Sequence, residues 1–123
     1  MLSQTAVVKV KTALESLYKD TMDVYERIQG TGTHHEVVYT ETKVQEAVPC
    51  RLSFSSSPVT TNGDVAETAQ TVKVFFSPSV TISAGSKIVI THEGVITAYK
   101  HSGVEAVYDS HKEVELDLFE RWA

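Results

Sequence analysis

The sequence contains a single cysteine, Cys50, among 123 residues. One thiol excludes an intramolecular disulfide framework, and the lack of paired Cys or Cys/His spacings removes any structural zinc signature. The fold must therefore be stabilised by packing. Because Cys50 lies in the apolar run Val48–Leu52, we expect its thiol to be buried and unreactive.

Long hydrophobic runs are also missing. No stretch of about 18 apolar residues is present, and the N-terminus lacks the charged-then-apolar pattern of a signal peptide. We therefore expect a cytoplasmic protein that does not contact a membrane.

Basic residues are few, since 11 Lys and Arg stand against 16 Asp and Glu and give a net charge of -5. Tight duplex DNA binding needs many Lys and Arg to neutralise phosphates, so any contact with nucleic acid is expected to be loose. Residues 105–123 hold six of the acids and two of the bases. This acidic segment is either a solvated face or a surface that meets a partner.

Motifs of enzyme chemistry are missing as well: there is no Gly-rich phosphate loop, Ser nucleophile elbow or Cys-His dyad signature. The adjacent pair His34-His35 points to opposite faces of a strand and cannot easily share a metal. We expect His92 and His111 to be exposed turn residues. The carboxylates of Glu113, Glu115 and Asp117 alternate along one strand, where solvation explains them better than shared-proton chemistry. We therefore expect no enzyme activity and no cofactor.

The length of 123 residues and mass of 13.5 kDa match one domain, 1–123. Across residues 3–18 an apolar stripe recurs at spacings of three and four, which predicts one short amphipathic helix with Ser3 as its N-cap. The stripe consists of Val7, Val10, Leu14 and Leu17. We expect it to dock on its own domain; contact with a neighbouring subunit is the alternative, so these four residues also form a candidate partner-facing surface.

From residue 20 onward the period changes to two, which predicts strands at 22–28, 36–43 and 46–55. In the third strand one face carries Val48, Cys50, Leu52 and Phe54. Pro49 within it indicates a strand edge or a bulge.

Residues 55–71 are small and polar and show no clear period, so we expect a long exposed loop. Loops of this length are uncommon in small domains and tend to be functional or disordered. The alternative is a mobile hairpin loop with no special role.

The last third of the chain predicts more short strands and turns. The expected elements are a strand at 71–76, a hairpin of 87–91 and 95–99 around the three-residue loop 92–94, a break at Gly103, and a final pair at 106–109 and 113–119. In the last strand Val114, Leu116 and Leu118 form the dry face. The prediction is a mainly β fold: a small antiparallel β-barrel or sandwich with one short N-terminal helix and a long polar loop. Without helical crossovers, a parallel α/β sheet is not expected.

Five strings in this order resemble a known family. They are Pro49-Cys50-Arg51-Leu52-Ser53-Phe54, Gln70-Thr71-Val72-Lys73-Val74-Phe75, Gly85-Ser86-Lys87-Ile88, Tyr99-Lys100-His101-Ser102-Gly103 and Ala106-Val107-Tyr108 before His111. Together they resemble the minor capsid proteins of siphophages and prophages of Gram-positive bacteria, which relate to the head-closure, or stopper, proteins of the head–tail connector. The similarity covers roughly residues 20 to 120.

The resemblance implies a virion protein, assembled in the host cytoplasm, that forms a ring, commonly of twelve copies. Its implied partners are the portal adaptor protein and the tail-completion protein, with transient, non-specific proximity to packaged DNA. A loop that projects into the channel would act as a plug. The candidate channel loop comprises Thr60, Thr61, Asn62, Gly63, Asp64, Val65 and Glu67.

Two other functions stay open. A minor tail or head-decoration module would bind the outside of a particle through the apolar face of the N-terminal helix. A ligand-binding barrel of the host is the other, although the inward residues of so small a barrel must fill its core and leave little space for a ligand.

Overall fold

The computed structural model describes residues 3–61 and 64–122, with the side chains of residues 3–55 and 70–122. Among these residues the elements are α1 (Gln4–Glu15), β1 (Asp20–Thr31), β2 (Val37–Thr61), β3 (Asp64–Phe76), β4 (Lys87–His92), β5 (Val95–Val107) and β6 (Lys112–Leu118). All pairings are antiparallel, and the order β1-β2-β3-β6-β5-β4 closes because β4 pairs with β1. The mainly β prediction is confirmed, and the barrel replaces the sandwich alternative.

One hydrophobic core fills the barrel. Its members are Met22, Val24, Cys50, Leu52, Val74, Phe76, Ile82, Ile88, Ile90, Tyr99, Val114 and Leu116. The strand residues among them alternate with outward side chains, as a single-sided sheet requires. Ile82 comes from the segment between β3 and β4, which is held by hydrogen bonds from Gln45 Nε2 to the Thr81 carbonyl (2.8 Å) and from Lys112 Nζ to the Val80 carbonyl (2.9 Å).

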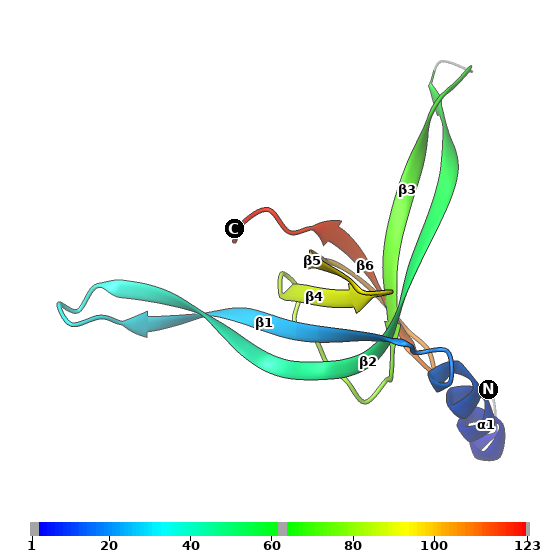
Figure 1. The fold of residues 1–123 in the computed structure, drawn as a ribbon, viewed down its shortest axis with the longest axis horizontal. Coiled ribbons are helices and arrows are strands. Elements are labelled where there is room, and N and C mark those ends of the chain that lie inside the picture. Colours follow the sequence, from blue (N-terminus) through cyan, green and yellow to red (C-terminus); the bar gives the residue numbers. More distant parts are fainter. Residues whose placement is uncertain (1–2, 62–63, 123) are drawn as a thin grey trace.

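Two strand pairs continue past the barrel wall and form ribbons (Figure 1). β1 pairs with β4 only over Thr21–Tyr25, so the rest of β1 and the facing part of β2 form a two-stranded β1–β2 arm. β3 pairs with β6 only over Val72–Phe76, so Ser55–Thr61 and Asp64–Thr71 form a β2–β3 arm. In Figure 1 the first arm extends to the left and the second upward.

The predicted long loop is therefore wrong in its local structure. Residues 55–61 and 64–71 form the β2–β3 arm, with register pairs from Ser55↔Thr71 to Thr61↔Asp64, and Asn62 and Gly63 lie outside the described residues. Apolar alternation marks a strand only where one face is buried. A ribbon outside the barrel wall does not face the core, so its strands need not carry the period that predicts them.

Three strand boundaries also differ from the predictions. The two strands expected at 36–43 and 46–55 are one strand, β2, which a bulge bends at Ala47 (φ 50°) without breaking its pairing. Gly103 (φ 97°) lies at a bulge inside β5 rather than ending it. The loop at 92–94 is a two-residue turn, because His92 pairs with Val95 and both Glu93 and Gly94 have positive φ.

Two single-residue predictions had different outcomes. Pro49 lies where β2 has β1 on one side only, since β3 ends at Phe76, opposite Cys50, so the edge prediction is confirmed. Leu118 is not on the dry face: its side chain is 68% exposed, because β3 no longer flanks β6 beyond Leu116.

Candidate functional site

Val7, Val10 and Leu14 share one face of α1, and Ser3 is its N-cap, as predicted. The helix ends at Glu15 rather than at residue 18, so Leu17 lies in the turn that follows it. No residue of α1 is buried. Leu14 and Leu17 line a crevice of about 70 Å³ together with Arg51, Phe75 and His111. The expected docking on the barrel therefore holds only for the C-terminal turn, where the chain enters β1.

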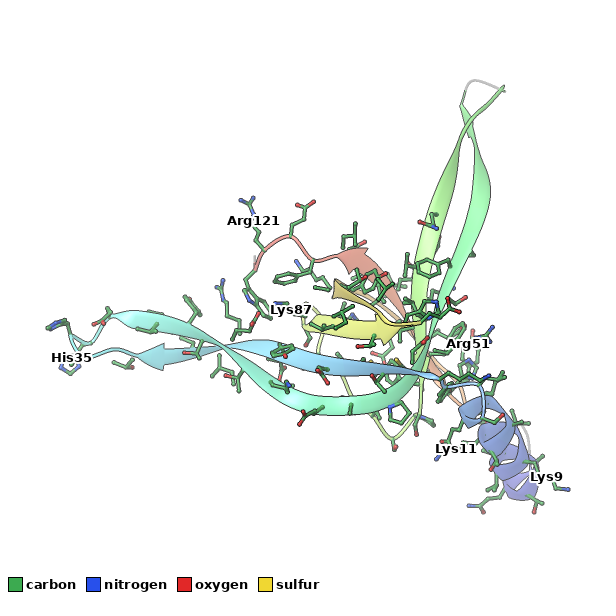
Figure 2. All side chains as sticks on the ribbon, viewed as in Figure 1. Lys9, Lys11, His35, Arg51, Lys87 and Arg121 are labelled. Atoms are coloured by element: carbon green, nitrogen blue, oxygen red, sulfur yellow. The ribbon has the colours of Figure 1, made fainter. Side chains whose placement is uncertain are left out.

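The N-terminal half of α1 projects away from the barrel. Val10 is 39% exposed and Val7 half-buried, and Figure 2 shows Lys9 and Lys11 on this free part of the helix. At 100° per residue, Lys9 and Lys11 lie on opposite borders of the apolar stripe. An apolar stripe with so little cover of its own is a candidate docking surface.

The described candidate channel residues, Thr60, Thr61, Asp64, Val65 and Glu67, lie together on the β2–β3 arm. The backbone pairs are Val59↔Glu67, Thr60↔Val65 and Thr61↔Asp64, and Asn62 and Gly63 lie outside the described residues. In residues 55–71 the only charged residues are Asp64 and Glu67. The arm is thus a long ribbon with two acids and no Lys or Arg.

Two aspartates accept hydrogen bonds from main-chain N–H groups near the points where the arms leave the barrel. The sequence analysis did not single them out. The Asp20 side chain is 8% exposed and accepts a hydrogen bond from the Leu52 backbone N–H through Oδ2 (2.9 Å), while Oδ1 lies 2.9 Å from His92 Nδ1. Asp23 accepts one from the N–H of Ala47 at the bulge (2.8 Å). No sequence pattern marks the distant partners of Asp20 and Asp23.

The histidine predictions were partly wrong. His92 and His111 are half-buried rather than exposed. The His111 ring stacks on Tyr108 (4.7 Å between centroids) and meets the edge of Phe75 (5.8 Å). His101 is 2% exposed, and its Nδ1 accepts a hydrogen bond from the Gly103 N–H (2.9 Å) at the β5 bulge.

The described part of the chain shows no cluster of metal-ligating side chains, and its buried thiol is protonated. Within it, no group of three or more His, Cys, Asp or Glu is placed to hold a metal ion. Cys50 is buried, as predicted, and burial raises the pKa of its thiol to about 12. Burial, followed by the charge of Glu15, raises the pKa of Tyr18 above its ordinary value. Both shifts keep these groups neutral at pH 7.

No helix in the described residues has the length and hydropathy needed to cross a bilayer.

The described strands define a closed six-stranded antiparallel β-barrel with two ribbon arms. A solved structure with a similar fold is the phage-like element PBSX protein xkdH from Bacillus subtilis, at a TM-score of 0.51 and 18% sequence identity. The match covers 80% of this chain and 93% of that one. At this identity the likeness shows the fold alone. No protein-family model and no curated protein matches the chain.

Proposed function

We propose that this protein is a structural, non-enzymatic component of a tailed-phage particle at the head–tail junction. In this proposal the chain forms a ring, contacts the portal adaptor and tail-completion proteins, closes the DNA channel after packaging and offers a docking surface to the tail. The fold likeness to a protein of a phage-like element supports a phage origin.

The observation that carries the proposal is the β2–β3 arm. Beyond Ser55 and Thr71 its described strands pair only with each other, so their outer main-chain edges have no strand partner in the described chain. A long ribbon without further strand partners suits a role in which the arm meets other molecules, since an isolated two-stranded ribbon is only marginally stable in water.

The charge of the arm agrees with a channel position. Lys and Arg would bind the phosphates of passing DNA, whereas residues 55–71 have two acids and no base. Such a lining repels the duplex and lets it slide. Several arms brought together in a ring would then block the channel mechanically rather than by binding DNA.

The test is to replace residues 58–68 with Asn-Gly, which joins the backbone pair Ser57↔Ala69 by a two-residue turn. The control is Glu93→Asn, which keeps a two-residue turn between β4 and β5. We expect particles with the shortened arm to assemble heads that lose their DNA in cryogenic electron microscopy, and control particles to stay full. Full heads with the shortened arm would count decisively against a channel-closing role.

One observation favours a second candidate function, a minor tail or head-decoration module: the N-terminal half of α1 is exposed. A photo-crosslinker at Val10 separates the two functions. Crosslinks to the portal adaptor support the connector proposal, and crosslinks confined to the major capsid or tail-tube protein support the second candidate.

A further inference from the structure

The β1–β2 arm has two free edges. β4 pairs with β1 only up to Tyr25, and β3 pairs with β2 only from Cys50, so Glu26–Thr31 and Val37–Lys43 have each other as their only strand partner in the described chain. Figure 1 shows no other element beside this ribbon. Near the barrel Glu26 and Arg27 line a crevice with Ala84, Gly85, Ser86 and Trp122. From Ile28 to Thr31, and along Val37–Lys43, the outward N–H and C=O groups have no strand partner in the described chain and can accept another strand.

The β2 edge lacks the usual protection against strand addition. Natural edge strands are blunted by Lys, by Pro or by bulges. Between Val37 and Thr42 the β2 edge has none of these, and the sequence there is β-branched and aromatic. A free edge of this composition is a template for β-pairing.

The two faces of the arm differ. Cross-strand partners share a face, so Ile28 lies with Thr40, and Gly30 with Val38, on a face whose one charged residue within the paired strands is Glu26, opposite Thr42. Ile28 is 48% and Val38 39% exposed. Apolar side chains on a free ribbon gain cover only from a further molecule.

The opposite face carries complementary charges on the two edges. Arg27 of β1 and Glu41 of β2 are cross-strand partners there, but they form no ion pair: Arg27 stacks on the Tyr39 ring (3.9 Å to its centroid). Glu41 binds Lys87 through Oε1 (2.9 Å), and its Oε2 has no hydrogen bond to another described residue. The β1 strand therefore carries a cation and the β2 strand an anion at matching register positions, and neither is neutralised by the other.

We propose that the β1–β2 arm joins copies of this chain, with the free β1 edge of one copy pairing with the free β2 edge of the next. Repeating the register found within the chain sets Arg27 opposite Glu41 of the neighbour and Ile28 opposite its Thr40. The contact is head-to-tail: each copy uses its β1 edge for one neighbour and its β2 edge for the other. Contacts of this kind form a ring when the rotation from copy to copy closes. This extends the proposed ring by naming its subunit contact.

The test mixes two purified variants, Thr31→Cys and Val37→Cys, and oxidises the mixture over a concentration series. These positions are cross-strand partners within the chain, so in the repeated register residue 31 of one copy faces residue 37 of the next. Because each variant has one introduced thiol, no intramolecular bridge can form. Cys50, fully buried, does not compete, and its lack of reaction reports that both variants are folded.

The matched control mixes Thr31→Cys with Val95→Cys, since Val95 is 62% exposed, Val37 57%, and Val95 lies outside the arm. We expect the mixed disulfide dimer in the first mixture to exceed that of the control, and to be lost when Val38→Lys and Thr40→Lys are added to the Val37→Cys chain. A yield no higher than the control overturns the proposal, as does a Thr31→Cys homodimer at equal yield. Because the readout is on purified protein, it is independent of the DNA-retention experiment.

Discussion

At the scale of single residues, Asp20 supplies a hydrogen-bond acceptor at the point where the pairing of β1 with β2 ends. β1 begins at Asp20, opposite Cys50, so β1 has no residue to pair with Leu52 on β2. The Asp20 carboxylate takes the place of the missing strand, because it accepts from the Leu52 N–H and also binds His92 at the end of β4. One side chain thus ties together β1, β2 and β4.

Removing this carboxylate should destabilise the barrel. We expect Asp20→Ala to lower the free energy of unfolding by about 1–3 kcal/mol, because the N–H of Leu52, a buried residue, loses its acceptor. The measurement is urea unfolding followed by circular dichroism. Asp117→Ala is the control, since Asp117 is exposed and has no ion pair in the described chain; equal losses for the two variants would contradict the role given to Asp20.

The bulge at Ala47 offers a stabilising change. Ala47 has φ 50°, a left-handed conformation that costs a residue with Cβ about 1–2 kcal/mol. Glycine adopts it freely but loses more entropy on folding, so Ala47→Gly should raise stability by about 0.5–1 kcal/mol. The melting temperature in thermal unfolding measures this gain in stability. Ala98→Gly, in β5 without a positive φ, should instead lower the melting temperature. A lower melting temperature for both variants would show that Ala47 is not strained.

At the scale of elements, α1 and the two arms differ from the barrel strands in having little cover. α1 has no buried residue, and each arm beyond the barrel is a two-stranded ribbon. The barrel therefore does not depend on these elements for its core. Their length and composition are better explained by contacts outside the chain.

A truncation tests the independence of the barrel from α1. Removing residues 1–12 keeps Leu14, Leu17 and Tyr18, which line crevices on the barrel. We expect the free energy of unfolding to change by less than about 1 kcal/mol, since the side chains of residues 3–12, the described part of the removed segment, are exposed or half-buried. Phe76→Ala is the destabilising reference, at about 3–5 kcal/mol. A comparable loss on truncation would show that α1 is part of the core.

At the scale of the whole molecule, closure depends on strands that are distant in sequence. β1 pairs with β4 from Thr21↔Thr91, and β3 with β6 from Val72↔Leu116. Each pairing closes a long chain loop before its contacts form, so the loss of chain entropy comes early in folding.

Folding should accordingly be slow. We expect refolding from urea to take milliseconds to seconds, as in other barrels dominated by non-local pairing. Stopped-flow fluorescence of Trp122, near the end of the chain and packed edge-on against Phe119 (5.2 Å), follows it. Refolding in microseconds would mean that closure is not the slow step.

Several features were predictable because they depend on local pattern. Alternation with one buried face predicted β1, the inward face of β2 and the Val114–Leu116 part of β6, and the spacing of Val7, Val10, Leu14 and Leu17 predicted α1. Ser3 as N-cap and the burial of Cys50 were also predictable. The roles of Asp20 and His92 were not, since their bond joins residues 72 positions apart.

The sequence by itself determined a mainly β chain with one short helix, because burial on one side of a strand or helix imposes a period that can be read along the chain. Only the tertiary structure decided that the strands close into a barrel, that residues 55–71 are a ribbon and that the β1–β2 arm has open edges. Each of these depends on which strands pair and where pairing stops, and hydrogen bonds between main-chain groups leave no period in the side chains.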